Sequence, residues 1–516
     1  MTQGSNTWNE SDERHATLLN NAQAVRALCA AIEGTLGPKG LDVMLVGPNG
    51  DVIITNDGVT ILESMDVSHP IAKLVIQVAR AQQHEVGDGT TTATVLAGAL
   101  VQAGVEQVVE GVPAAKVAAG VEHGVNIARE LLQERAIPIQ GFDDPLLHQA
   151  VHIAGREHND IVQLVMDAAR AVGIHQLQSP QYRFADSIVA HEKAKNEWFE
   201  GLLLKQKPLQ QEWHSKRENC RVVVMQDSLE PEAMDEHLLT TEAGFEQYMR
   251  LKASFMEQLQ ELHALHVGFI VLERGIAPEA EQFCLDHEIM VIQRVSREDV
   301  KKVAKLTGAK PLKRSALHKD QEALRSMLGN AELVYYDERL ERVRLYAGKT
   351  SEYTARTDKL VTMIVGASTR EVVGERVRIA ADAAAALQAA VQSGILPGGG
   401  ATELALAYKL ERYRETVRGM EAFGIAAVAH ALRKPMSQIV LNAGFNPLEK
   451  LEEARAAQAS EGTDTIGIHC DTGSLMDTLK AGIVDPAQVK LHALAAAGEV
   501  ACAVLRIHTV IKMKSQ

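Results

Sequence analysis

Aromatic residues and cysteines are scarce in this sequence. Phe, Trp and Tyr make up 4% of the 516 residues, so large cores must be built mainly from Ala, Val, Leu and Ile. The five cysteines are odd in number, lie far apart and form no CxxC pair, which argues against a disulfide framework or a zinc site. They are Cys29, Cys220, Cys284, Cys470 and Cys502.

Long apolar runs and an excess of positive charge are also missing. No uninterrupted apolar run approaches the roughly 18 residues needed to cross a bilayer, and the polar segment 1–10 has no signal-peptide core. The 53 basic and 67 acidic residues give a net charge of −14, which disfavours nonspecific binding to nucleic acid. We therefore expect a cytoplasmic globular protein that binds neither membranes nor nucleic acid.

Two common phosphate-binding motifs are absent as well. No GxGxxG sequence follows a strand pattern. The triplet Gly348-Lys349-Thr350 resembles the end of a GxxxxGK[ST] loop, but Val343 stands where that loop requires its first glycine. We predict a surface turn at this triplet.

The aromatic residues that are present mark a boundary in the chain. Of the 20 aromatic residues, 14 fall between Tyr182 and Tyr353. The two flanks are instead Ala-rich and show apolar residues at helical spacing, for example at 71–86 and 90–110. A chain of this length suggests about three domains. We expect a distinct central domain, and we expect the two flanks to pack together as one discontinuous domain.

The central region alternates strand and helix patterns. Short Val/Ile-rich runs at 221–225, 267–272 and 290–295, the last two joined by a helical stretch at 277–287, predict βαβ units. The tract 228–266 between the first two runs is long for a connection. It can form ordinary surface helices, which its composition favours, or a protruding helical arm that meets a partner.

A hairpin is predicted in the first flank. The runs Val43–Val46 and Val52–Thr55 have strand character, and they bracket the turn sequence Gly47-Pro48-Asn49-Gly50.

The segment Gly87-Asp88-Gly89-Thr90-Thr91-Thr92-Ala93-Thr94 is the most unusual in the chain. It follows one helical pattern and opens another, so its glycines and the free N–H groups of the second helix can cradle a phosphate. An aspartate in such a cradle repels phosphate unless a cation lies between them, so Asp88 is expected to hold Mg²⁺. The alternative is a simple helix cap, which does not require this density of Gly and Thr.

Three other glycine-containing loops occur at 35–40, 55–58 and 397–401. Each alone is most often a turn or a helix cap. Together with segment 87–94 they fit one site for a large anionic ligand. Asp382 lies in an otherwise apolar, Ala-rich stretch and is either a solvated helix position or a carboxylate that faces a cleft and orients a water.

These segments together resemble the chaperonins, specifically the group II type of archaea and the eukaryotic cytosol. The resemblance covers nearly the whole chain and extends to the bacterial chaperonins sometimes termed group III. The segments that carry it occur in the family's order and spacing. They are Thr35–Gly40, Thr55–Gly58, His69-Pro70, Gly87–Thr92, Thr369–Asp382, Gly398–Gly400 and Asp485-Pro486.

The resemblance implies a multidomain chaperonin fold. Its parts would be a mainly helical equatorial domain, a small α/β intermediate domain, and an α/β apical domain whose helical lid protrusion lies at about 228–266. The implied boundaries are equatorial 1–144 and 395–516, intermediate 145–194 and 357–394, and apical 195–356.

The resemblance also implies roles for individual residues in a site for ATP and Mg²⁺. Asp57 and Asp382 would orient the attacking water, Asp88 would hold Mg²⁺, and Asp485 would meet the ribose. The family's phosphate-sensing lysine is absent, and Arg156 is a possible substitute for it. Further nucleotide contacts would come from Thr35, Leu36, Gly37, Pro38, Asn56, Gly58, Gly87, Gly89, Thr90, Thr91, Thr92, Gly399 and Gly400, with the nucleobase near Gly467–Cys470.

The implied function is ATP-driven protein folding. Subunits would form stacked rings, most commonly two rings of eight, that enclose unfolded polypeptides and close with a built-in lid, without a separate lid protein. Two other functions remain open from the residues alone. One is an ATP-dependent metabolic enzyme, and the other is a holding protein that binds unfolded chains without ATP turnover.

Overall fold

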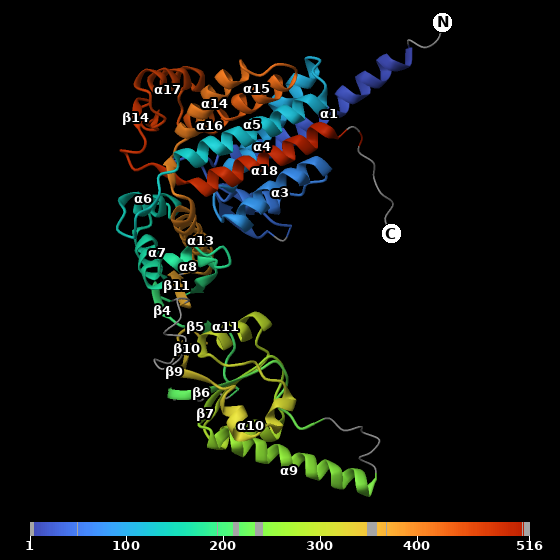
Figure 1. Cartoon of the computed structure of the whole chain (residues 1–516), viewed down its shortest axis with the longest axis vertical. Coiled ribbons are helices and arrows are strands. Elements are labelled where there is room, and N and C mark those ends of the chain that lie inside the picture. The colour runs from blue at the N-terminus through green and yellow to red at the C-terminus, as the bar shows by residue number, and fades with distance from the viewer. Residues whose placement is uncertain are drawn as a thin grey trace. The chain divides into compact units, whose positions relative to one another are not determined.

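The computed structural model describes residues 5–48, 50–192, 194–209, 216–232, 241–347, 359–367, 369–507 and 509. Three features discussed above lie outside these residues, at least in part: the triplet Gly348-Lys349-Thr350, Asn49 of the hairpin turn, and positions 233–240 of the expected protrusion. The chain divides into two compact units (Figure 1). Unit 1 comprises Met1–Val162, Arg183–Ala185 and Arg378–Gln516, and unit 2 comprises Gln163–Tyr182 and Asp186–Val377.

Unit 1 is mainly helical and draws on both ends of the chain. Two helices, α7 and α13, continue past its sequence boundaries. The helices with residues in this unit are α1 (Ser5–Glu33), α2 (Gly58–Ser64), α3 (Pro70–Glu85), α4 (Thr90–Val109), α5 (Ala114–Arg135), α6 (Pro145–Ala154), α7 (Asn159–Val172), α13 (Arg370–Ser393), α14 (Ala401–Arg414), α15 (Glu421–Ala431), α16 (Lys434–Asn442), α17 (Pro447–Glu461) and α18 (Ala487–Arg506).

The core of unit 1 explains the scarcity of aromatic residues. Helices α4, α5 and α18 pack side by side (Figure 1), and the buried cluster between them and their neighbours consists of Ala, Val, Leu, Ile and Cys. Where α5 crosses α15, a Cβ added to Gly120 would lie 2.1 Å from the Glu421 carbonyl oxygen. Helices this close leave room only for small side chains. Helices α4 and α18 are long and apolar enough to cross a membrane, but 67% and 61% of their apolar windows are buried in this core.

Three short two-stranded sheets complete unit 1. The predicted hairpin is confirmed, because β1 (Val43–Val46) pairs antiparallel with β2 (Val52–Thr55). The other two pairs involve residues near the glycine loops: β12 with β15, and β13 with β14. Their bounds are β12 (Ile395–Pro397), β13 (Ile466–Ile468), β14 (Leu475–Asp477) and β15 (Val484–Pro486).

Unit 2 contains a six-stranded sheet of order β5-β10-β9-β6-β7-β8 and a three-stranded sheet of order β3-β11-β4. Strands β6, β7 and β8 are parallel, as the predicted βαβ units require. The side chains of β7 and β8, and those of β6 from Val222 onward, are almost continuously buried, which is typical of parallel strands covered on both faces. The strands are β3 (Ile188–Glu192), β4 (Glu197–Glu200), β5 (Leu202–Leu204), β6 (Arg217–Met225), β7 (Val267–Leu272), β8 (Met290–Ile292), β9 (Gly329–Asp337), β10 (Arg342–Ala347) and β11 (Val361–Ala367).

Helix α9 is the longest helix of unit 2 in the described residues. Its C-terminal half packs Phe255, Leu259 and Leu262 into the core, whereas Phe245 and Met249 of its N-terminal half are exposed. Figure 1 shows this N-terminal half extending beyond α10. The helices that lie entirely in this unit are α8 (Ile174–Leu177), α9 (Glu242–Ala264), α10 (Pro278–Asp286), α11 (Arg297–Thr307), η3 (Arg314–His318) and α12 (Gln321–Arg325). The short helix η1 (Phe184–Ser187) begins in unit 1 and ends in unit 2.

Candidate functional site

The Gly-Asp-Gly segment forms the turn between α3 and α4. Gly87 and Gly89 have φ angles of 78° and 76°, a left-handed conformation that glycine adopts without strain. Gly89 is the N-cap of α4 and makes no side-chain cap hydrogen bond, so the first N–H groups of α4 remain available for a ligand. The side-chain amide of the buried Gln82 donates a hydrogen bond to the Asp88 carbonyl oxygen (2.8 Å), and this bond holds the turn against α3.

The same glycines allow two distant helices to approach the turn. A Cβ at Gly87 would lie 2.6 Å from the Ala385 Cβ of α13, and a Cβ at Gly89 would lie 2.5 Å from the Val489 Cγ1 of α18. Because α13 carries Asp382, the turn and this carboxylate are held in one unit. Glycine is therefore needed at both positions for two reasons: the positive φ angle, and the close approach of α13 and α18.

A cleft of about 290 Å³ opens beside this turn. It is lined by several residues that the sequence singled out, and by residues it did not. The former are Leu36, Gly37, Asp88, Gly89, Thr92, Arg156, Asp382 and Asp485. The latter include Ile153, Glu403, Pro435, Val489 and Lys490.

The remaining candidate residues lie outside the lining of this cleft. Most of them shape the loops around it. They are Thr35, Pro38, Asn56, Asp57, Gly58, Gly87, Thr90, Thr91, Gly399 and Gly400, together with the nucleobase segment Gly467–Cys470.

Asp88 is the carboxylate best suited to a divalent cation. Burial raises its pKa to about 6; the N–H of Gly89 (2.6 Å) and the charge of Arg156 oppose this shift, and Asp485 and Asp57 add to it. A single buried carboxylate beside an anion-binding helix N-terminus fits Mg²⁺, which is usually bound by one or two carboxylates together with phosphates. Among the described residues there is no cluster of three or more His, Cys, Asp or Glu side chains that could hold a metal without a ligand.

Asp57 has a structural role in the ligand-free protein. It is the N-cap of α2, and its Oδ2 accepts hydrogen bonds from the Thr60 N–H (3.0 Å) and hydroxyl (2.5 Å). Its Oδ1 lies 3.5 Å from the Thr90 hydroxyl at the start of α4. A Cβ at Gly58 would lie 2.6 Å from the Thr91 hydroxyl, so the starts of α2 and α4 are in direct contact. Asp57 is therefore adjacent to the threonines of the proposed phosphate cradle.

The Asp382 carboxylate lies close to the guanidinium of Arg156 in the cleft. Its Oδ2 is 3.8 Å from an Nη of Arg156, and the two side chains are 18% and 28% exposed. Arg156 and Glu157 have φ angles of 48° and 62°, which are uncommon for non-glycine residues and tend to occur at functional sites.

Two glycine loops are fastened by neighbouring side chains. Asn442 donates to the carbonyl oxygens of Glu33 (2.8 Å) and Leu36 (2.9 Å), which holds the loop that follows α1. In the loop before α14, Gly400 has a φ of 80°, and a Cβ there would lie 2.7 Å from the Cβ of Met436. Both loops are thereby held against α16.

Four supporting residues were not identified from the sequence: Gln82, Glu403, Asn442 and Lys490. Gln82 and Asn442 each make contacts across more than 400 positions of the chain. Lys490 and Glu403 contact each other across 87 positions. No local pattern predicts such pairs. The only signal is a polar residue within an otherwise apolar helical stretch, and this signal is weak.

Comparison with known proteins identifies the class. The model of the TCP-1/cpn60 chaperonin family matches residues 28–515. The chain therefore belongs to the TCP-1/cpn60 chaperonin family, whose members are ATPases that assemble into rings and bind unfolded polypeptides.

Individual relatives agree with this assignment. The chain is 31% identical to thermosome subunit beta of Archaeoglobus fulgidus, over 96% of this chain and 91% of the relative. It is 30% identical to a thermosome subunit of Methanocaldococcus jannaschii, over 95% of this chain and 91% of the relative. A crystal structure of a group III chaperonin in the open state is 42% identical, with a TM-score of 0.86 over 97% of this chain and 100% of that chain. The chaperonin fold expected from the sequence is thus confirmed.

Proposed function

We propose that this chain is a chaperonin subunit that hydrolyses Mg²⁺-ATP in the cleft of unit 1 and uses a built-in lid to enclose unfolded polypeptides. The observation that carries the proposal is the convergence of Asp88, Asp382 and the open N-terminus of α4 on one cleft. Rings in the cytoplasm, most commonly two rings of eight, and no separate lid protein are part of the same proposal.

Phosphate binding would use the start of α4. The free N–H groups of its first turn and the hydroxyls of Thr90, Thr91 and Thr92 donate hydrogen bonds to phosphate oxygens. Asp88 would hold Mg²⁺, which when bound neutralises charge on the phosphates. The loops that carry Gly37 and Gly399 would lie along the rest of the nucleotide.

Hydrolysis would depend on carboxylates that position a water. Asp382 lines the cleft and would accept the proton of the attacking water, with Asp57 as its partner. Arg156 lies beside Asp382 and would stabilise the charge that develops on the terminal phosphate. This arrangement matches phosphoryl transfer, in which positioning and electrostatics do most of the catalytic work.

The exposed apolar face of the β1–β2 hairpin favours the proposed self-association. In its antiparallel register Met44 faces Ile54, and Val46 faces Val52. These four side chains share one face of the hairpin, and they are 61%, 56%, 67% and 52% exposed. An exposed apolar strand pair is a ready surface for another copy of the chain.

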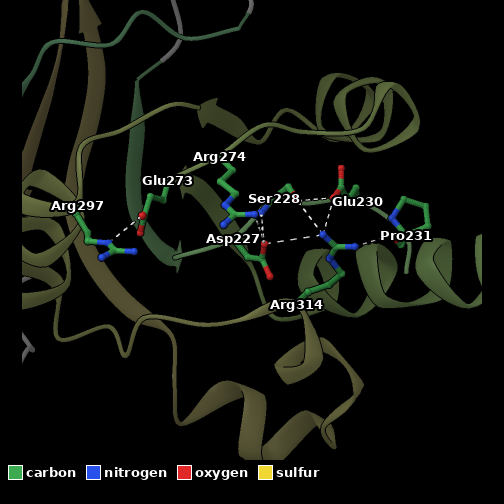
Figure 2. Close-up of polar contacts among 8 residues, drawn as sticks. All are labelled: Asp227, Ser228, Glu230, Pro231, Glu273, Arg274, Arg297 and Arg314. Carbon is green, nitrogen blue, oxygen red and sulfur yellow. Dashed lines mark hydrogen bonds and ion pairs between the residues drawn. The ribbon is translucent and has the colours of Figure 1, made fainter. Parts of the chain in front are cut away.

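Two features favour the proposed lid: the exposed apolar side chains of α9, and the contacts that hold the segment before α9. The exposed Phe245 and Met249 are four residues apart on one side of the helix, and they offer an apolar surface beyond the core. The segment that precedes the protrusion is fastened by Arg314, whose guanidinium donates to the Pro231 carbonyl (3.0 Å), the Ser228 hydroxyl (2.9 Å) and Glu230 (2.5 Å), as Figure 2 shows.

Helix η3, which carries Arg314, makes a second set of contacts at the base of the protrusion through His318. His318 lies 3.3 Å from the Glu232 carboxylate and 2.9 Å from the side-chain amide of Gln258 in α9. Helix η3 therefore contacts both the segment that leads toward α9 and α9 itself. Such a base would let the protrusion move as one body with the sheet of unit 2.

Electron microscopy of the purified full-length protein tests the proposal directly. Samples without nucleotide and with ATP plus a transition-state mimic of the γ-phosphate should show open rings and capped rings, respectively. Rings that never cap would reject the built-in lid but keep the rest. Absence of rings in both samples, with phosphate transfer to a metabolite, would instead support a small ATP-dependent enzyme.

A further inference from the structure

Gln82 holds the Gly-Asp-Gly turn with both its backbone and its side chain. It lies in the last turn of α3 and is completely buried. Its backbone carbonyl accepts hydrogen bonds from the N–H groups of Val86 (2.9 Å) and Gly87 (3.1 Å). Its side-chain amide nitrogen donates to the Asp88 carbonyl oxygen (2.8 Å). One residue is thus bonded to three consecutive residues, and the third carries the carboxylate that is proposed to hold Mg²⁺.

The same amide connects the turn to helix α18. Its nitrogen also donates to the Val489 carbonyl oxygen (3.2 Å) in the first turn of α18, and its oxygen lies 2.7 Å from Nδ1 of His492 in the same helix. The side chains of Val86 and Val489 share a small buried cluster with Ala389 of α13. The turn is therefore joined to α18 by polar and apolar contacts together.

The partners of this amide determine which way it points. The carbonyl oxygens of Asp88 and Val489 can only accept hydrogen bonds, so the NH₂ group of Gln82 must face them and its oxygen must face the imidazole. That oxygen is also an acceptor, so Nδ1 of His492 must carry a proton. Burial lowers the pKa of His492 below its usual value. The ring is therefore neutral at pH 7, with its single proton on Nδ1 and donated to Gln82.

Asp88 needs such support because of its neighbours. It stands between Gly87 and Gly89, and glycines leave the backbone more conformational freedom than any other residue. The Gly89 N–H donates to Asp88 Oδ1 (2.6 Å), whereas the Gln82 amide holds the Asp88 carbonyl oxygen. The side chain and the backbone of Asp88 are thus fixed separately. Residues that orient a metal ligand in this way typically contribute a factor of about 10–100 to metal affinity.

We propose that Gln82 and His492 are positioning residues for the metal site: the imidazole orients the Gln82 amide, and the amide holds the Asp88 backbone so that its carboxylate is presented to Mg²⁺. The inference rests on the proposed function of the cleft as a site for Mg²⁺-ATP. It extends that site to two residues that do not line the cleft. It also makes metal binding depend on α18, because His492 lies 410 positions after Gln82.

The first test replaces Gln82 by methionine, which has a similar length but no amide. Mn²⁺ serves as a probe for Mg²⁺, since both favour octahedral oxygen ligands. Its binding to the assembled full-length protein with ADP is measured by electron paramagnetic resonance. Gln82→Met should weaken Mn²⁺ binding about tenfold to a hundredfold. The affinity for ADP without metal should change little, because the N–H groups at the start of α4 remain. In ATP hydrolysis, the half-saturating Mg²⁺ concentration should rise more than kcat falls.

A second test compares two substitutions of His492. In His492→Asn the side-chain NH₂ group replaces Nδ1–H and can still donate to Gln82, whereas in His492→Leu no donor remains. The asparagine variant should bind Mn²⁺ almost as well as the wild type, and the leucine variant about tenfold more weakly. Thermal unfolding without metal checks that both are folded. The control is His430→Leu, at an exposed histidine of α15 in the same unit, which should leave Mn²⁺ binding unchanged.

The outcomes separate the inference from the proposed function. A folded Gln82→Met that binds Mn²⁺ as the wild type does would overturn the inference, and so would an equal loss of ADP affinity without metal. Equal Mn²⁺ affinities of the two His492 variants would reject the role of the imidazole. If Gln82→Met does not fold, the His492 variants decide, because both keep the Gln82 amide. A wild type that binds neither ADP nor Mn²⁺ would reject the proposed function, and the inference with it.

Discussion

The Arg156 guanidinium lies 3.8 Å from the Asp382 carboxylate at the edge of the cleft in the ligand-free chain. The two residues come from different helical regions, with Arg156 just after α6 and Asp382 within α13. Both residues line the cleft, so under the proposed function each would also face the terminal phosphate of a bound nucleotide. Their proximity suggests that the arginine holds the carboxylate in place until phosphate competes for the cation.

Replacing Asp382 by alanine should separate nucleotide binding from hydrolysis. The variant should bind ATP normally, because the phosphate contacts at α4 remain, and it should hydrolyse ATP about 10²–10⁴ times more slowly, since a carboxylate that takes the water's proton is lost. Steady-state phosphate release and equilibrium binding measure the two properties. The control is Asp66→Ala, at an exposed aspartate in unit 1. Normal turnover of Asp382→Ala would remove this residue from the catalytic site.

Arg156→Asn tests the guanidinium while retaining the left-handed backbone, because asparagine tolerates positive φ better than most residues. We expect a loss of about 10²–10³ in kcat, in the range for removing one electrostatic contact to a developing charge. Affinity for ADP, which lacks the terminal phosphate, should change little. An equal loss of ADP and ATP affinity would instead indicate a general structural role for Arg156.

The raised pKa of Asp88 predicts a pH-dependent response to Mg²⁺. Because the folded-state pKa of about 6 exceeds the ordinary value of 3.8, this group favours the folded, ligand-free protein at low pH and loses that contribution as pH rises through 6. Mg²⁺ binding requires the ionised form, so its apparent affinity should be about tenfold weaker at pH 5 than at pH 7.5.

Thermal unfolding with and without Mg²⁺-nucleotide at the two pH values measures this effect. Asp88→Asn should lose the Mg²⁺-dependent part of the stabilisation at both pH values. A wild-type shift in melting temperature that is the same at pH 5 and pH 7.5 would contradict the assignment of Asp88 as the ligand.

Two adjacent glycines offer a matched pair of substitutions. Gly399 and Gly400 have φ angles of 62° and 80°, so alanine costs about 1–2 kcal/mol at either position. Only at Gly400 would the new Cβ also collide with a neighbour, at 2.8 Å from the Met436 backbone nitrogen, whereas the nearest atom to a Cβ at Gly399 is 3.8 Å away. Gly400→Ala should therefore add about 1–3 kcal/mol of overpacking and weaken ATP binding.

Denaturant unfolding and ATP affinity should both separate the two variants. Equal effects of Gly399→Ala and Gly400→Ala would mean that α16 can shift without cost, and that its packing does not shape the loop.

Arg314→Met should loosen the base of the protrusion. The substitution removes three hydrogen bonds to the segment 228–231 and leaves the Ser228 hydroxyl as the remaining donor to Glu230, at a cost of about 1–2 kcal/mol in the local stability of unit 2. We expect faster cleavage near this segment by a non-specific protease, and slower lid closure with ATP and a γ-phosphate mimic.

The matched control is Arg297→Met, because Arg297 is 77% exposed and pairs with Glu273, a separate ion pair in the same view (Figure 2). If both variants are cleaved at the wild-type rate, the contacts of Arg314 do not fasten the protrusion.

The sequence predicted those parts of the fold that local patterns encode. The strands of the hairpin match the predicted runs, and the helices on either side of Gly87–Thr94 begin and end within a residue or so of the predicted pattern. The strand patterns at 267–272 and 290–295 appear as β7 and the shorter β8, because the ladder at β8 continues only as far as Ile292. Local steric and hydrogen-bonding rules are sufficient for these elements.

The cleft could be predicted only in part. Motif residues such as Gly37, Asp88 and Asp382 do line it, but the ion pair of Lys490 with Glu403 depends on how two helices start from one small sheet. A lysine in the first turn of a helix is locally unfavourable next to the positive end of the helix dipole. Its place in the structure follows from tertiary contacts that no window of the sequence contains.

The cleft joins Leu36 near the beginning of the chain to Lys490 near its end, and this sets an order of events during synthesis. A ribosome must complete almost the entire polypeptide before the second half of the cleft exists, whereas the sheets of unit 2 are encoded between positions 186 and 377. Domains generally fold as units while the chain emerges. Unit 2 can thus mature while unit 1 still lacks its C-terminal helices, so an incomplete chain would expose an unfinished helical core to the cell.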